Sequence, residues 1–329
     1  MTLKRTGSCG PKIFQAVLVA ACAAAIPSLA VASCGSAFCS VNTNWTMESA
    51  MTEPGSALDL RYESINQDQP RAGTDKVALG QIRDHHDEVS TFNRNLLATY
   101  NRNFNSTWGM ALTAPLVERD HLHIHNHQGE KIDERWKFTK LGDIRVQGRY
   151  SLSYLGDPLN PSSAGISFGL KLPTGKTDIA NADGDVAERS LQPGSGTTDA
   201  LIGAYYHQKL PARDSSWFAQ MQYQHPLNSN HNFKPGDQLS LDAGYRHGYG
   251  DKLGALVQLN FLAKRRDSGG EAEPSDSGAK FLSLSPGLSY AVTDRLQVYG
   301  FVQLPVYQDV NGVQLTAEKS LVVGLSSRF

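Results

Sequence analysis

A run of histidines spaced by two is the segment whose residue types most directly offer chemistry. Its members are His121, His123, His125 and His127. On an extended strand this spacing puts the four imidazoles on one face, where neutral rings could bind a borderline metal such as Zn, Cu or Ni. A second pair, His85 and His86, lies in the preceding polar segment and could complete the site. The alternative is a solvated histidine-rich loop that gains charge below about pH 6.5.

Charged and amide residues that recur at every second position form the other chemical candidate. In the segment 144–154, apolar or aromatic residues and Gly148 alternate with polar residues, which predicts a strand with one apolar and one polar face. If the apolar faces meet lipid, the polar faces line an interior. The residues we expect there include Arg61, Glu63, Arg145, Arg149, Lys171, Gln222, Asp242 and Arg246. They would form a polar solute path, or a plugged interior held by ion pairs.

The elements that position these side chains are alternating segments along most of the chain. We expect strands at 58–63, 90–102, 108–117, 144–154, 166–172, 199–209, 217–224, 238–249, 253–261, 281–292, 296–306 and 318–329. Short connections and longer polar ones follow one another in turn, as they do in transmembrane barrels with tight periplasmic turns. The sequence therefore predicts an all-β, antiparallel, up-and-down transmembrane barrel of about 12 strands in the outer membrane of a Gram-negative bacterium.

Two further features favour a membrane barrel. Aromatic residues mark the strand ends beside the short connections, where an interfacial girdle is expected: Tyr100, Trp108, Tyr154, Tyr206, Trp217, Tyr249 and Tyr290. The last strand ends on Phe329, which resembles the recognition signal of bacterial outer-membrane barrels. The expected partners are therefore outer-membrane lipids and, through Phe329, the barrel assembly machinery.

Composition excludes other classes of protein. The chain of 329 residues has 31 Lys and Arg against 32 Asp and Glu, so no basic excess exists for binding nucleic acid by bulk charge. After the first 32 residues no apolar run reaches 18, which excludes helical membrane spans.

The first residues have the pattern of an export signal. A basic start precedes an apolar stretch at 13–29, and Ala30-Val31-Ala32 fits a cleavage site. We therefore expect a signal peptide at 1–32, a polar segment at 33–56 and the barrel at 57–329. Cys34 and Cys39 are expected to form a small disulfide loop, with lipidation of Cys34 as the alternative.

No catalytic constellation is evident, so no catalytic residues are predicted. An outer-membrane phospholipase would need a lipid-facing His with a Ser two residues on. His225 has that parity, but Pro226 and Leu227 follow it.

Three Gly- and Pro-rich segments carry a family resemblance. Residues Gly169 to Gly175 (GLKLPTG), Leu191 to Gly196 (LQPGSG) and Pro235 to Asp237 (PGD) resemble the MetA-pathway of phenol degradation family. The resemblance implies an outer-membrane barrel that transports small, often aromatic, compounds, and it supplies no catalytic residues.

These observations favour a porin-like channel or transporter for small solutes, with no cofactor beyond a metal ion at the histidines. Counted over all the inward-facing positions, five cations oppose three carboxylates, which slightly favours anionic solutes. The alternative is a non-conducting barrel whose His-rich loops capture metal ions or a partner.

Overall fold

The computed structural model describes residues 54–82, 87–127, 130–155 and 159–329. The expected signal peptide, the pair Cys34 and Cys39, and the pair His85 and His86 lie outside these residues. No helix in the described part of the chain is long and apolar enough to cross a bilayer.

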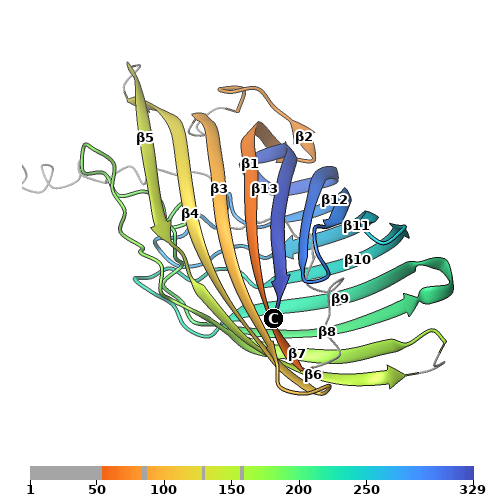
Figure 1. The fold of residues 1–329 in the computed structure, drawn as a ribbon. Helices are drawn as coiled ribbons and strands as arrows, with labels where there is room; N and C mark the ends of the chain where they lie inside the picture. The colour runs from red at the N-terminus through yellow and green to blue at the C-terminus, as the bar shows by residue number, and fades with distance from the viewer. Residues whose placement is uncertain (1–53, 83–86, 128–129, 156–158) are drawn as a thin grey trace, which may run out of the picture. The chain divides into compact units, whose positions relative to one another are not determined.

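Antiparallel strands form one closed wall (Figure 1). Its elements are β1 (Gly55–Gly73), β3 (Asp87–Asn103), β4 (Trp108–His127), β6 (Ile144–Leu155), β7 (Ser162–Leu172), β8 (Asp199–Leu210), β9 (Ser215–Pro226), β10 (Gln238–Tyr249), β11 (Leu253–Lys264), β12 (Ala279–Ala291) and β13 (Leu296–Arg328). Each pairs with the next, and β13 pairs with β1 to close the wall. The short β2 (Asp75–Lys76) and β5 (Glu130–Leu141) lie outside this path.

The long element β13 is a hairpin whose two halves each form one strand of the barrel wall. Residues 297–310 pair with β12, whereas residues 310–328 pair with β1. Gly312 has a φ of +59°, and the Arg328 amide donates to the Arg295 carbonyl at 2.9 Å. Because β13 supplies two strands, the eleven wall elements form twelve barrel strands. This even number lets the first and last strands pair antiparallel. The prediction of an all-β barrel of about 12 strands is confirmed, but the loop expected at 307–317 is the tip of this hairpin.

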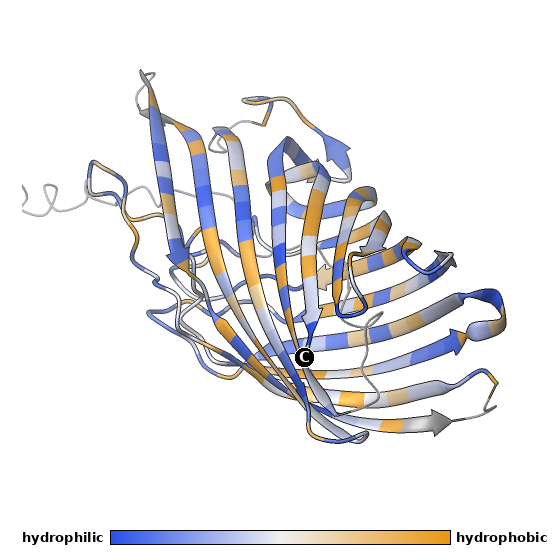
Figure 2. Cartoon of the chain, in the orientation of Figure 1, coloured by the Kyte–Doolittle hydropathy of each residue, from blue (hydrophilic) through white to orange (hydrophobic). Residues whose placement is uncertain are grey.

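The strands alternate between an apolar outer face and a polar inner face (Figure 2). On β1, Leu58, Leu60 and Tyr62 are exposed, whereas Asp59 and Glu63 are 4% and 1% exposed. A soluble domain has the reverse arrangement. In lipid, the arrangement of this barrel is the stable one, because a closed wall pairs every strand edge and the apolar side chains contact the acyl chains.

The barrel end with the short connections carries the expected aromatic residues. Trp108, Trp217, Tyr249 and Tyr290 are all more than one third exposed there. The connection between β8 and β9 is a single 3₁₀ turn, η1 (Pro211–Arg213), which Asp214 ends at a φ of 44°. These rings are placed to meet the headgroup level of a bilayer.

Strand β4 changes partner half-way along its length. Residues 108–113 pair with β6, and residues 116–127 pair with β5. Pro115 lies at the change, where its missing N–H costs no ladder bond, and its carbonyl accepts from the Gly142 amide at 2.8 Å. The segment 118–141, expected as a loop, is therefore a β4–β5 hairpin that continues the wall (Figure 1). Gly142 and Asp143 separate β5 from β6.

Candidate functional site

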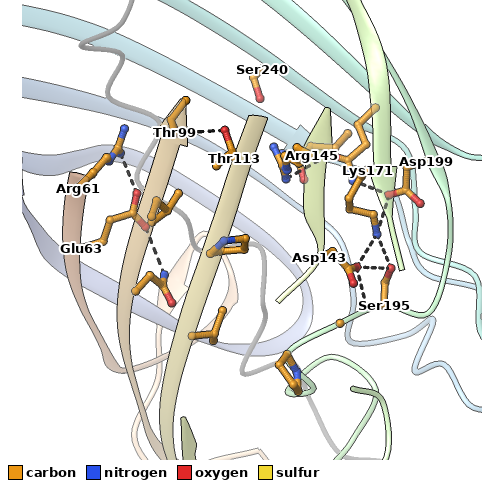
Figure 3. Close-up of a pocket in the computed structure, with 18 of the residues that line it drawn as sticks. Arg61, Glu63, Thr99, Thr113, Asp143, Arg145, Lys171, Ser195, Asp199 and Ser240 are labelled. Atoms are coloured by element: carbon orange, nitrogen blue, oxygen red, sulfur yellow. Dashed lines mark hydrogen bonds and ion pairs between the residues drawn. The ribbon is translucent and has the colours of Figure 1, made fainter. Parts of the chain in front are cut away.

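A polar cavity of about 370 Å³ lies inside the wall (Figure 3). Of the residues predicted to line the interior, Arg61, Glu63, Arg145, Lys171 and Asp242 line this cavity. Arg149 and Gln222 line a second cavity of about 140 Å³. Arg246 lines neither of these two cavities, and its guanidinium lies against Gly254.

A buried cluster around Lys171 forms one side of the cavity (Figure 3). The Lys171 Nζ lies 3.0 Å from a carboxylate oxygen of Asp143 and 3.0 Å from one of Asp199, and it also donates to the Ser195 hydroxyl. Asp199 is fully buried and accepts from Thr197 at 2.7 Å and from Gln224 at 2.6 Å. One lysine thus holds two carboxylates, and further donors satisfy their remaining lone pairs.

The segment between β7 and β8, residues 173–198, folds against this cluster, and we call it the inner loop. Asp143 anchors both ends of it. The Gly175 amide donates to Asp143 Oδ1 at 3.0 Å, and the Ser195 amide donates to Asp143 Oδ2 at 3.0 Å. The two motifs PTG and QPGSG, which are distant in sequence, therefore meet at one carboxylate.

Glycine is required where the two motifs touch. A Cβ on Gly175 would lie 2.6 Å from the Gly194 Cα, and a Cβ on Gly194 would lie 2.4 Å from the Gly175 carbonyl oxygen. Both obstacles are backbone atoms, which cannot move aside as a flexible side chain would. The glycines of the two motifs thus allow a close backbone contact.

The rest of the inner loop covers the cavity. Leu191 is 1% exposed, and its carbonyl accepts from Arg119 at 3.2 Å. The fully buried Gln192 side chain donates to the carbonyls of Ile179 and Ala187, at 3.2 and 2.7 Å. Residues 189, 190 and 192–195 also line the cavity, so the inner loop narrows the lumen.

The cavity is also lined by residues that were not predicted to face the interior: Asp143, Asp199, Ser195, Arg119 and Arg189. The one signal that pointed to this region was the pair of Gly- and Pro-rich motifs. With these residues included, five cations and five carboxylates line this cavity, so its lining carries no net excess of either charge.

The carboxylates on the cavity wall all have partners in the protein. Lys171 holds Asp143 and Asp199, Arg61 lies 2.9 Å from Glu63, the Tyr299 hydroxyl donates to Asp59 at 3.0 Å, and Gln220 and Asn260 each donate to Asp242 at 2.8 Å. The carboxylates that line the cavity are therefore all engaged in hydrogen bonds or ion pairs with other residues of the protein.

The histidine run lies on strand β4, not in an irregular loop, and His121 and His123 are buried on its inward face. On the outward face of this part, Glu118 and Asp120 come before Leu122 and Ile124. Asp120 pairs with Arg135 of β5 at 2.6 Å, and these charged residues place this part beyond the apolar band. The buried His121 Nδ1 lies 2.8 Å from the Thr91 hydroxyl, and its Nε2 lies 3.4 Å from His123 Nδ1. The His123 Nε2 lies 2.9 Å from a Glu134 carboxylate oxygen.

Burial keeps the His121 ring uncharged. Desolvation, followed by the nearby His123 and Arg119, lowers the pKa of His121 to about 3. Among the described residues, no group of three or more His, Cys, Asp or Glu side chains is placed to hold a metal ion. The side chains of His125 and His127 lie outside what the structure describes, so the metal site stays a prediction.

A family model for the MetA-pathway of phenol degradation matches residues 78–316. The chain belongs to this family. The match spans the inner loop and its Asp143 anchor, so the motifs that resembled the family are also those that build the cavity. No curated protein matches the sequence significantly.

Solved structures give the same architecture. A crystal structure of an outer membrane channel from Pseudomonas putida F1 is similar at a TM-score of 0.65 and 11% identity, over 88% of this chain and 100% of that chain. A KdgM porin (TM-score 0.40, 11% identity, 83% and 99% covered) and a CymD monoaromatic hydrocarbon channel (0.37, 10%, 88% and 94%) match at lower similarity. The first likeness supports the fold, and the chain is an outer-membrane protein of the Gram-negative type.

Proposed function

We propose that this barrel is a channel that passes small solutes through its lumen. The observation that carries the proposal is that the two interior cavities share part of their walls. Asn101, Ala111, Gln147 and Gln220 line both cavities. These four shared lining residues, on β3, β4, β6 and β9, support one polar path along the barrel axis.

The calibre of this path is set by the inner loop. The cavity beneath it, about 370 Å³, is within the range that holds small organic molecules. The lining of this cavity carries no net charge, with five cations and five carboxylates. We therefore expect the channel to select solutes by size more strongly than by net charge. A small, weakly selective pore is the function that this geometry supports best.

The test is the single-channel conductance of the refolded mature protein in a planar bilayer. We expect small, stable current steps, because the inner loop narrows the lumen without filling it. Insertion without current would contradict the proposal and would favour the non-conducting binding barrel. Heat modifiability on a gel is the control for a folded, inserted barrel.

The same experiment tests the metal prediction. Zn²⁺ or Cu²⁺ that binds the histidine run would reduce the current, and a His121→Ala and His123→Ala double variant would abolish the block. The matched control is His247→Ala on β10, a histidine outside the run. No effect of either metal would contradict the prediction.

The chain terminus supports a proposed route to the membrane. Phe329 is two thirds exposed, while its backbone pairs with Ser56 in both directions at 2.9 Å. We propose that the side chain is thereby presented to the barrel assembly machinery.

A further inference from the structure

Arg145 differs from the other charged groups of the cavity in how little of the protein it contacts. It lies on β6, between Thr113 of β4 and Lys171 of β7, and its side chain lines the cavity (Figure 3). Within the described part of the chain its side chain makes one hydrogen bond, to Gln224 Oε1 at 3.4 Å. A guanidinium has five N–H donors, so most of its donor capacity faces the lumen.

The carboxylates within electrostatic range of Arg145 are already bonded to other cations. They are Asp199, Asp143 and Glu63. Lys171 bridges the two aspartates, and Arg61 pairs with Glu63. No ion pair within 4.0 Å joins Arg145 to a carboxylate of the described residues. Arg145 is therefore a cation that can accept an external anion without first breaking an ion pair.

Beside Arg145, the inward face of the wall is apolar. Leu97 of β3 pairs with Pro115 of β4, and both line the cavity together with the buried Val117. Pro115 lies two residues from Thr113, the register partner of Arg145, so it is a diagonal neighbour of the arginine. These three residues form an apolar patch within the cavity.

We propose that this part of the cavity is a subsite for a small carboxylate with an apolar body. The guanidinium would bind the carboxylate through two parallel N–H donors, and the body would lie over Leu97 and Pro115. Occupancy is brief, because Asp143 and Asp199 offset the positive charge nearby. The role of the subsite in transit rests on the proposed channel function, but the binding itself does not.

The test compares Arg145→Gln with Arg149→Gln. Arg149 lies four residues on, on the same strand and the same face, but it already donates to Asn103 and lines the other cavity. The probes are benzoate, acetate and the neutral benzamide. The readouts are the benzoate-to-chloride permeability ratio from reversal potentials, and benzoate binding to the refolded barrel in micelles by calorimetry, with a micelle blank.

We expect Arg145→Gln to lower the benzoate permeability ratio and affinity by roughly threefold or more, with Arg145→Lys intermediate and Arg149→Gln unchanged. Leu97→Asn should weaken benzoate but not acetate, and benzamide should bind least. Equal effects of Arg145→Gln and Arg149→Gln, or none, would overturn the subsite. If the barrel does not conduct yet binds benzoate through Arg145, the channel function fails and the subsite stands.

Discussion

The β4–β5 hairpin and the inner loop both stand out in the sequence, and the structure uses them in opposite ways. The hairpin carries the histidines, whose residue type promises chemistry, yet His121 and His123 are buried against Thr91, Glu134 and one another. The inner loop carries glycines and prolines that promise only turns, yet it forms the cover of the cavity.

The difference teaches that spacing places a side chain on a face, while its partners decide what it can do. On the hairpin, ring nitrogens are already in hydrogen bonds. In the cavity, Gly175 and Gly194 let two backbones meet so that one carboxylate, Asp143, can bind both motifs. The variants below test this contrast, beginning with the largest expected effect.

Asp143→Ala should release the inner loop. It removes the acceptor of two backbone amides and one partner of the buried Lys171. We expect a cost of about 3 kcal/mol or more in loop docking, because buried charged partners are left unpaired. Protease cleavage within residues 173–198 of the folded barrel measures it. Asp183→Ala, an exposed acid of the same loop, is the control, and equal cleavage of the two variants would refute the anchor.

Gly175→Ala should loosen the same loop by a smaller amount. The new Cβ would lie 2.6 Å from the Gly194 Cα, and we expect a cost of about 1–3 kcal/mol for overpacking. Amide hydrogen exchange of residues 176–195 should accelerate. Ala182→Val, which adds bulk at an exposed position of the loop, should leave the exchange unchanged; faster exchange in both variants would count against the close contact.

Thr91→Val should affect the hairpin and spare the inner loop. It removes the hydrogen bond of 2.8 Å to His121 Nδ1 while keeping the side-chain shape, so we expect a cost of about 1 kcal/mol. Hydrogen exchange of residues 116–141 is the measurement, with the exposed Thr139→Val as its counterpart. Unchanged exchange would mean that the buried imidazoles do not hold the hairpin.

Glu188→Gln should stabilise the inner loop only as pH rises. Burial of its carboxylate, followed by the nearby Glu273, Glu88 and Glu134, raises the pKa of Glu188 well above its usual value. A carboxyl with a raised pKa in the folded state contributes fully below its unfolded pKa, and this contribution is lost as pH rises through the folded pKa.

Amide hydrogen exchange of the inner loop should therefore be slower in Glu188→Gln than in the wild type at about pH 8. At about pH 4 the two proteins should exchange at the same rate. The two proteins are compared at each pH, with Asp183→Asn as the control. A difference of the same size at both values would refute the shifted pKa as its cause.

The strands were predictable because each follows one rule, apolar outward and polar inward, as Leu58, Asp59 and Leu60 illustrate. Strand β5 was missed because its buried Trp136 and Phe138 face inward and the charged Lys137 lies between them, which reverses the parity of the barrel.

The docking of the inner loop was not predictable for a different reason. Asp143 meets Ser195 across 52 residues, and no local pattern records such a bond. Alternation alone predicted that the Arg145 side chain points inward. That Arg145 has no carboxylate partner could not be predicted in this way, because it depends on Lys171 binding both Asp143 and Asp199.

The most direct test of the account is thiol block of two cysteine variants on β4. In a background without Cys34 and Cys39, Ala111→Cys places a thiol where the two cavities meet, and Ala114→Cys places one on the opposite, lipid-facing side. A charged methanethiosulfonate reagent should reduce the single-channel current of Ala111→Cys and leave Ala114→Cys unchanged. Current that persists unaltered in a modified Ala111→Cys barrel would contradict a solute path through the lumen.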